Sequence, residues 1–130
     1  GGGQVHLAAI GLHDEETDLW IVTSPSEIEL HLGGDAEKAS PVLIESAIWF
    51  RANRESFKKD IASFLRSEAK ESKKWQDMHE EIQELRIESV SLPWPERPND
   101  GMIYFCGNES ELVWRCDMIN RSPKDLGFDD

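Results

Sequence analysis

Residues 28–32 carry the clearest pattern in the chain, a strict alternation of apolar and polar side chains. A period of two is typical of a β-strand with one buried face. Residues 19–23 form a shorter run rich in aromatic and β-branched side chains, and the Ser-Pro-Ser sequence at 24–26 separates the two runs. Serine and proline at this point indicate a turn. We therefore predict a hairpin over residues 19–32, and a weaker alternation over residues 5–12 predicts a further strand.

The period becomes helical after residue 40. Ser40 and Pro41 suit the cap and the first position of a helix. Asn53 is suited to cap a second helix. Its apolar residues follow at i, i+4, i+7 and i+8, which is the stripe of an amphipathic helix. The stripe weakens over residues 67–74 and then resumes, so we predict either two helices here or one long helix with a break near Ser72. The apolar residues before the break are Phe57, Ile61, Phe64 and Leu65, and those after it are Trp75, Met78, Ile82 and Leu85.

Residues 87–92 have the composition of a β-strand, and a proline-rich loop follows at 93–101. Two apolar runs, 102–106 and 111–118, then predict a second hairpin, which we expect Ser122-Pro123 to end. Strands and helices are segregated along the chain, which favours an α+β fold over a parallel βαβ sheet. The predicted architecture is an antiparallel sheet of two hairpins plus additional strands, packed against two or three helices on one face.

The chain length of 130 residues suits a single domain. We interpret Gly1 to Gly3 as residues left from cloning and predict one α+β domain over residues 4–130. There is no run of about 20 apolar residues that would span a membrane. There is also no secretory signal at the start of this sequence, so we expect a cytoplasmic location without membrane association.

The formal net charge of −12 disfavours binding to nucleic acid. The charge is uneven, because residues 51–74 hold eight basic and four acidic side chains, a net charge of +4, which leaves −16 on the rest of the chain. One interpretation is a solvated helix face with pairs such as Glu55 and Lys59. The other is an acidic surface that docks on a basic partner.

The two cysteines, Cys106 and Cys116, lie on the two strands of the predicted second hairpin. With its turn at residues 107–110, Cys106 would face a residue between Glu109 and Leu112. Cys116 is then at least four residues further along, or roughly 13 Å at ~3.4 Å per residue. A disulfide needs Cα atoms within about 7 Å. We therefore predict two reduced thiols in the core, as in cytosolic proteins.

The sequence contains none of the local patterns that mark phosphate cradles, zinc sites or nucleophile elbows. We predict no catalytic residue, no metal site and no cofactor. The four histidines include no pair at helical i,i+4 spacing. Glu29 and His31 share one face of the predicted strand and could form a hydrogen-bonded pair, which is the strongest argument for the alternative of a small enzyme.

Trp94 is set apart from the other four tryptophans because prolines flank it on both sides in a loop. One interpretation is that its indole folds back as a lid over the core. The other is that a stiff loop presents it to a partner, since exposed aromatic residues anchor interfaces. The candidate contact residues are Trp94, Glu96 and Arg97 on the proline loop, and Asp14, Glu15, Glu16 and Asp18 on an acidic loop.

Several segments resemble small bacterial domains of unknown function, in particular the families numbered 2262 and 6985. The segments are a strand with Glu-Ser within residues 85–90, the hairpin strands 102–105 and 111–115, and the ending at 123–129. The first family has a Gly-His pair where this chain has Arg115-Cys116. The resemblance implies an α+β fold without an assigned activity, and such acidic domains often resemble immunity proteins that neutralise toxins.

Three hypotheses about function follow. The first, which we favour, is a non-enzymatic protein-binding module, with an immunity-type inhibitor of a basic toxin as its most specific form. The second is a small enzyme whose pocket is assembled from distant residues, including His31. The third is a structural or regulatory domain trimmed from a longer chain.

Overall fold

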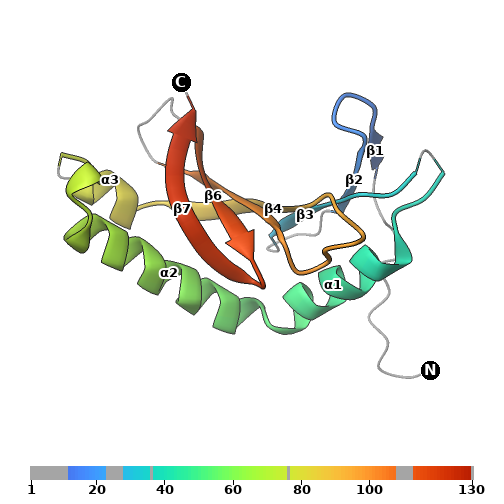
Figure 1. Ribbon diagram of the computed structural model, residues 1–130, viewed down its shortest axis with the longest axis horizontal. Coiled ribbons are helices and arrows are strands. Elements are labelled where there is room, and N and C mark those ends of the chain that lie inside the picture. The colour runs from blue at the N-terminus through green and yellow to red at the C-terminus, as the bar shows by residue number, and fades with distance from the viewer. Residues whose placement is uncertain (1–11, 23–27, 36, 76, 108–112, 130) are drawn as a thin grey trace.

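The computed structural model describes residues 12–22, 28–35, 37–75, 77–107 and 113–129. Within these residues, seven strands form one sheet and three α-helices pack on it (Figure 1). The predicted strand at residues 5–12, the turn at 24–26 and most of the predicted hairpin turn at 107–110 lie outside the described residues, except for Leu12 and Gly107. The strands are β1 (Leu12–Asp14), β2 (Leu19–Val22), β3 (Glu29–Leu32), β4 (Arg86–Leu92), β5 (Gly101–Cys106), β6 (Val113–Ile119) and β7 (Ser122–Asp129), and the helices are α1 (Pro41–Ala52), α2 (Arg54–Glu71), the 3-10 turn η1 (Lys73–Trp75) and α3 (His79–Gln83).

The strands lie in the sheet in their sequence order, from β1 to β7. Every neighbouring pair is antiparallel except β3 and β4, which run parallel. The α+β prediction is confirmed, but the sheet does contain one βαβ crossover. The three helices form that crossover, because they connect two adjacent strands that point the same way. Segregation of strands and helices along the sequence did not reveal the direction of β4.

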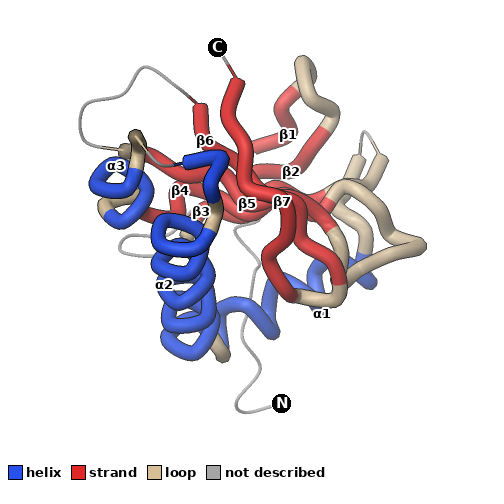
Figure 2. Tube along the Cα trace, turned by 60° about the vertical axis from the view of Figure 1, so that its left-hand side comes forward, coloured by secondary structure: helices blue, strands red, loops and turns tan. Residues whose placement is uncertain are grey.

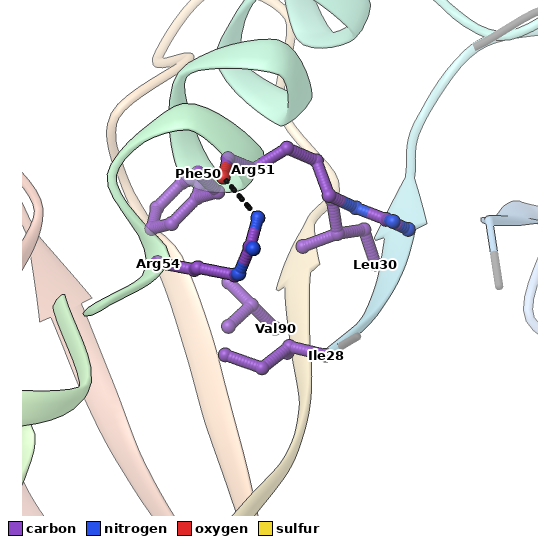
Figure 3. A pocket seen from close by; sticks show the side chains of 6 residues that line it. All are labelled: Ile28, Leu30, Phe50, Arg51, Arg54 and Val90. Atoms are coloured by element: carbon purple, nitrogen blue, oxygen red, sulfur yellow. Dashed lines mark hydrogen bonds between the residues drawn. The ribbon is translucent and has the colours of Figure 1, made fainter. Parts of the chain in front are cut away.

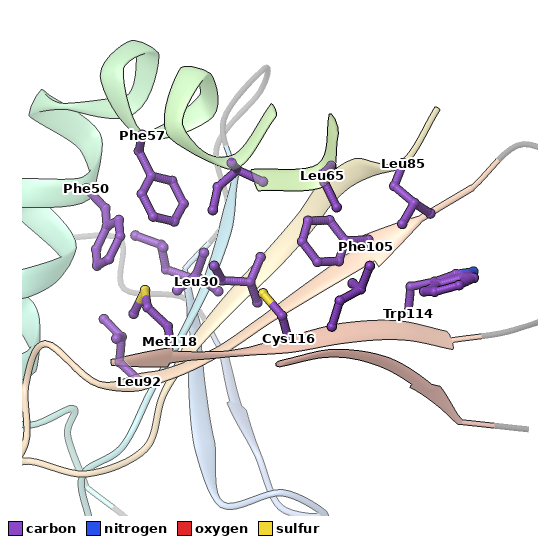
Figure 4. Close-up of a cluster of buried hydrophobic side chains, with 14 of the residues drawn as sticks. Leu30, Phe50, Phe57, Leu65, Leu85, Leu92, Phe105, Trp114, Cys116 and Met118 are labelled. Carbon is purple, nitrogen blue, oxygen red and sulfur yellow. The ribbon is translucent and has the colours of Figure 1, made fainter. Parts of the chain in front are cut away.

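The helices cover one face of the sheet, as Figures 1 and 2 show. The stripe predicted for α2 is buried at Phe57, Ile61 and Leu65, and Phe64 packs at its margin. The apolar side chains of β3 pack against the helices from the sheet side of the core, together with those of β4, β5 and β6. Figure 4 shows the resulting core, which includes Leu30, Leu92, Phe105, Trp114, Cys116 and Met118.

The predicted start of α1 and the break near Ser72 are found, but neither Ser40 nor Asn53 makes a side-chain hydrogen bond as an N-cap. The second apolar set is helical only in part, because Trp75 lies in η1, α3 spans only His79–Gln83 and Leu85 follows α3. Pro41 is the first residue of α1 and Ser72 ends α2 after Glu71. Asn53 stands between α1 and α2, but its side-chain amide donates a hydrogen bond of 2.9 Å to the Trp49 carbonyl oxygen. It therefore closes the end of α1 rather than capping the start of α2.

The prediction that Ser122-Pro123 ends the second hairpin was wrong. Residues 122–129 form β7, which pairs with β6 across a two-residue turn. Asn120 and Arg121 in that turn have φ angles of 53° and 65°, the left-handed conformation that a tight hairpin turn requires. Asparagine adopts this conformation readily, whereas arginine rarely does. Because Arg121 stands where the usual Asn-Gly turn has glycine, the sequence did not indicate a hairpin here. Pro123 is accommodated because β7 is an edge strand of the described sheet.

The cysteines are separate free thiols, as predicted. Cys116 pairs with Ile103, three positions from Cys106, and is fully buried. The register is one residue off the expected range, because Phe105 pairs with Trp114. Burial raises the pKa of the Cys116 thiol to about 12, since the thiolate would lose its hydration there. Cys106 is half-buried rather than a core residue.

Candidate functional site

Three connecting segments leave the sheet at the same end. The start of β2 lies beside the end of β3, and Leu32 at the end of β3 pairs with Leu92 at the end of β4. The β1–β2 turn (15–18), the segment after β3 (33–40) and the proline loop (93–100) are therefore at one end of the sheet, which we call the loop end. Figure 1 shows the first two at the right of the view and the proline loop in orange beside α1. Both groups of predicted contact residues lie at this end.

The acidic β1–β2 turn is ordered by hydrogen bonds to Asp14. Its carboxylate accepts one from the Thr17 hydroxyl at 2.9 Å and one from the Glu16 amide at 3.1 Å. These bonds lower the pKa of Asp14 below its usual 3.8, because they stabilise the ionised carboxylate. Glu15, Glu16 and Asp18 are exposed. The turn therefore presents three carboxylates to solvent on a backbone whose shape is held by a fourth.

The same turn is tied to the segment after β3 through two aromatic rings. The His13 ring contacts the Asp18 carboxylate at 2.7 Å and packs on the Trp20 ring at a centroid distance of 5.0 Å. The Trp20 indole donates a hydrogen bond of 2.9 Å to the Asp35 carbonyl oxygen. Trp20 thereby links the turn to residues 33–40, which carry further exposed carboxylates.

The proline loop is anchored to elements distant in sequence. The Ser46 hydroxyl on α1 donates a hydrogen bond of 2.9 Å to the Pro98 carbonyl oxygen. The Arg121 backbone amide donates to the Asn99 carbonyl oxygen at 2.9 Å, and its Nε donates to the Asn99 side-chain oxygen, also at 2.9 Å. The loop is thus fixed between α1 and the β6–β7 turn by hydrogen bonds that do not involve the Trp94 indole.

These anchors also stabilise the unusual β6–β7 turn. The Asp100 carboxylate accepts a hydrogen bond of 2.8 Å from the Asn120 amide. The Arg121 guanidinium lies over the Trp49 ring, 3.9 Å from its centroid, which holds the arginine of the strained turn in place. Desolvation in this position lowers the pKa of Arg121. The proline loop and the turn therefore hold each other in shape.

Trp94 is half-buried, and its ring lies 4.2 Å from the Arg97 guanidinium, a cation–π pair within the loop. Trp20 and Trp49 pack against the hydrophobic core of the described residues, whereas Trp94 is not among the side chains that do. This arrangement favours presentation to a partner over a lid on the core. Glu96 and Arg97 beside it are exposed.

Acidic side chains predominate at the loop end. Together with Asp14 and Arg121, which adjoin them, its described segments carry eight carboxylates and three cationic side chains, a net charge of −5. Glycine at position 33 permits the close approach of two of these segments, because a Cβ there would collide with the carbonyl oxygen of Pro93. The carboxylates are Asp14, Glu15, Glu16, Asp18, Asp35, Glu37, Glu96 and Asp100, and the cations are Lys38, Arg97 and Arg121.

The Glu29–His31 pair lies on the sheet face opposite the helices. The carboxylate of Glu29 contacts Nε2 of His31 at 2.6 Å, so the pair that the sequence indicated does form. In the register with β4, His31 pairs with Ser91 and Glu29 with Ser89. Both serines are buried, and no hydrogen bond between the described side chains joins either of them to the imidazole. His31 is one residue from the end of β3. It adds a small electrostatic contribution to the lowered pKa of Asp14, after the hydrogen bonds from Thr17 and Glu16, so the pair borders the acidic turn of the loop end.

Within the part of the chain that the structure describes, no three histidine, cysteine or acidic side chains are grouped in a way that would hold a metal ion. None of the described helices is long and apolar enough to cross a membrane. No family model, no curated protein and no solved structure matches this chain. The resemblance to bacterial domains of unknown function therefore remains an expectation from the sequence.

Four residues that organise the loop end were not singled out by the sequence. They are the anchors of the proline loop, and each lies far in sequence from the group that it contacts. Their side chains are common in helices and turns, so no local pattern marks them. The one available signal was Asn99-Asp100-Gly101 after a proline, which indicates a turn but not what it touches. The four are Ser46, Trp49, Asn99 and Arg121.

Proposed function

We propose that this protein is a non-enzymatic protein-binding module that contacts a basic partner through the loop end of its sheet. The observation that carries the proposal is the stacked pair of Trp94 and Arg97 on an anchored loop, at the same end of the sheet as an ordered acidic turn. An immunity-type inhibitor that neutralises a basic toxin is the most specific form of this function. The toxin's cationic surface would then meet the carboxylates of residues 14–18.

The energetics of recognition support this assignment. Tryptophan and arginine are the residue types most often found as interface hot spots. The proline loop is already held by hydrogen bonds to Pro98 and Asn99, so that less conformational entropy is lost on binding. The surrounding carboxylates accelerate association with a basic surface and make it sensitive to salt. A central aromatic anchor with an acidic surround is therefore well suited to a cationic protein.

The test is capture of partners from a lysate of the protein's own source at low and at high salt, with identification by mass spectrometry. We expect a basic protein that binds at low salt and is released at high salt. The double variant Glu15→Lys with Glu16→Lys should lose this partner. A matched control, Asp60→Lys with Glu88→Lys at exposed positions of α2 and β4, makes the same change in net charge away from the loop end and should retain it. Equal loss in both variants would show that net charge alone, and not this surface, attracts the partner.

A further inference from the structure

The Trp94–Arg97 stack places a cation in the middle of the surface that is proposed to meet a basic partner. The Arg97 guanidinium lies 4.2 Å from the centroid of the Trp94 ring, and its side chain is exposed. It is one of three cations among eight carboxylates at this end of the sheet. Like charges that face each other across an interface cost free energy. A basic partner therefore either avoids the Trp94 ring or moves Arg97 away from it.

The Arg97 guanidinium is held by the indole ring alone. Other arginines have stronger partners: Arg115 pairs with the Asp129 carboxylate at 3.0 Å, and Arg54 donates a hydrogen bond of 3.3 Å to the Arg51 carbonyl oxygen (Figure 3). Among the residues that the structure describes, no hydrogen bond or ion pair joins the Arg97 guanidinium to another group. A cation–π pair at an exposed site is weak, so a competing cation can displace Arg97 from the ring.

The backbone that carries the ring is fixed independently of Arg97. The proline loop is hydrogen-bonded to α1 and to the β6–β7 turn. It also lies against the segment after β3, where the Gly33 amide donates a hydrogen bond of 2.9 Å to the Leu92 carbonyl oxygen. The approach is so close that a Cβ on Gly33 would collide with the Pro93 carbonyl oxygen. The loop therefore keeps its place when Arg97 leaves the ring, and little order has to be created on binding.

Ionised carboxylates flank this loop. Asp35 follows Gly33 in the neighbouring segment, and its carboxylate accepts hydrogen bonds from the amides of Glu37 at 2.8 Å and Lys38 at 2.9 Å. These bonds lower the pKa of Asp35 below its usual 3.8, because they stabilise the charged form. Glu96 is exposed on the proline loop itself. A guanidinium both stacks on an aromatic ring and binds carboxylates with its fork of N–H groups, whereas an ammonium acts as a point charge.

We infer that Arg97 covers the Trp94 ring only in the free protein and stands in for an arginine side chain of the partner. In the complex, the partner's guanidinium stacks on the ring and pairs with the surrounding carboxylates, and Arg97 turns to the solvent. The inference rests on the function proposed above and adds the chemistry of the contact, which is an arginine rather than a lysine. Arg97 then competes with the partner, so that it weakens the binding to which Trp94 contributes.

The peptide acetyl-Arg-Gly-Arg-Gly-Arg-amide at low salt is the probe that tests this contact. We expect a saturable shift of the indole Nε1–H signal of Trp94 in NMR spectra of the whole chain. The δ-methylene protons of Arg97, which lie over the ring in the free protein, should lose their ring-current shift as the peptide binds. The peptide with lysine in place of each arginine has the same charge and should bind roughly threefold more weakly or worse, since only the guanidinium both stacks and forks.

The variant Arg97→Ala separates a competing side chain from a contact residue. It leaves the ring open, so the arginine peptide should bind roughly threefold more tightly or better, which is the size of one exposed cation–π pair. Lys38→Ala is the matched control, because it removes one exposed cation from the loop end without touching the ring. Its effect on the affinity should stay below about twofold, as for a single screened surface charge.

Three results would overturn the inference. Weaker binding to Arg97→Ala would show that Arg97 itself contacts the peptide, and an equal gain in both variants would show that net charge alone matters. Equal affinity for the lysine peptide, or saturation without movement of the Arg97 protons, would show that no guanidinium takes its place on the ring. Capture of a basic partner whose affinity is the same for Arg97→Ala would keep the proposed function and overturn only this inference. Absence of a captured partner, while the peptide displaces Arg97, would count against the proposed function alone.

Discussion

Replacement of Trp94 by alanine tests whether this residue contacts a partner or supports the fold. The indole of Trp94 is outside the hydrophobic core, and its cation–π pair with Arg97 is worth about 0.5–1 kcal/mol at a site of this exposure. The loop backbone keeps its hydrogen bonds from the Ser46 hydroxyl and the Arg121 amide without the indole. Allowing for the apolar area that the half-buried ring covers, we expect the free energy of unfolding to fall by about 1–2 kcal/mol. A hot spot in the interface should lose about 2 kcal/mol or more of binding free energy, a Kd roughly 30-fold weaker.

Urea unfolding followed by circular dichroism measures the first quantity, and titration with the captured partner measures the second. Trp114→Ala is the matched control, because the Trp114 ring is fully buried against Trp75 and Phe128. Its loss should cost about 3–5 kcal/mol of stability. If Trp94→Ala destabilises the fold as much as Trp114→Ala does, then Trp94 is a lid on the core and the contact interpretation is refuted. Unchanged partner affinity in a stable Trp94→Ala protein would refute it as well.

Three further predictions concern the parts that hold the fold and the loop end in shape. Gly33→Ala should lower the free energy of unfolding by about 1–3 kcal/mol, because its Cβ meets the backbone of the proline loop; urea unfolding checks this. A thiol reagent at pH 8 should label Cys106 rapidly and Cys116 only on unfolding, since burial raises the pKa of Cys116 to about 12; peptide mass mapping identifies the labelled thiol. Ionised Asp14 should stabilise the β1–β2 turn above pH 3.8, and this contribution should be lost as the pH falls through its lowered pKa; the carboxyl carbon shift in NMR reports this, and Thr17→Val should move the midpoint back toward 3.8.

Periodicity predicted most of the regular structure. The alternation at residues 28–32 became β3, and the stripe beginning at Phe57 became the buried side of α2. These patterns are local, because a half-buried strand and an amphipathic helix each record their burial in their own sequence. The strand β7 was not predicted, because Pro123 and the turn residue Arg121 each disfavour a hairpin when only the local sequence is considered. Pro123 and the turn residue Arg121 are acceptable only at the edge of this sheet and with the proline loop bonded to the turn.

The candidate contact residues were found from composition, but their relation to one another was not. An acidic run and a tryptophan between prolines are visible in the sequence, about 80 residues apart. Their position at one end of the sheet follows from the parallel pairing of β3 with β4. That pairing depends on how three helices fold back over the sheet, which no short window of sequence contains. The hydrogen bond between Glu29 and His31 was predictable, because a spacing of two places both side chains on one face of a strand.

The sequence by itself determined the class of the fold, the start of α1, the break after α2, the apolar stripe of α2 and the acidic character of the chain. These properties depend on the spacing of side chains along a few turns or strand positions. Tertiary structure alone decided the parallel β3–β4 pair, the edge strand β7 and the anchoring of the proline loop. These features arise from contacts between residues tens of positions apart, where the energy of a group is set by its neighbours in space.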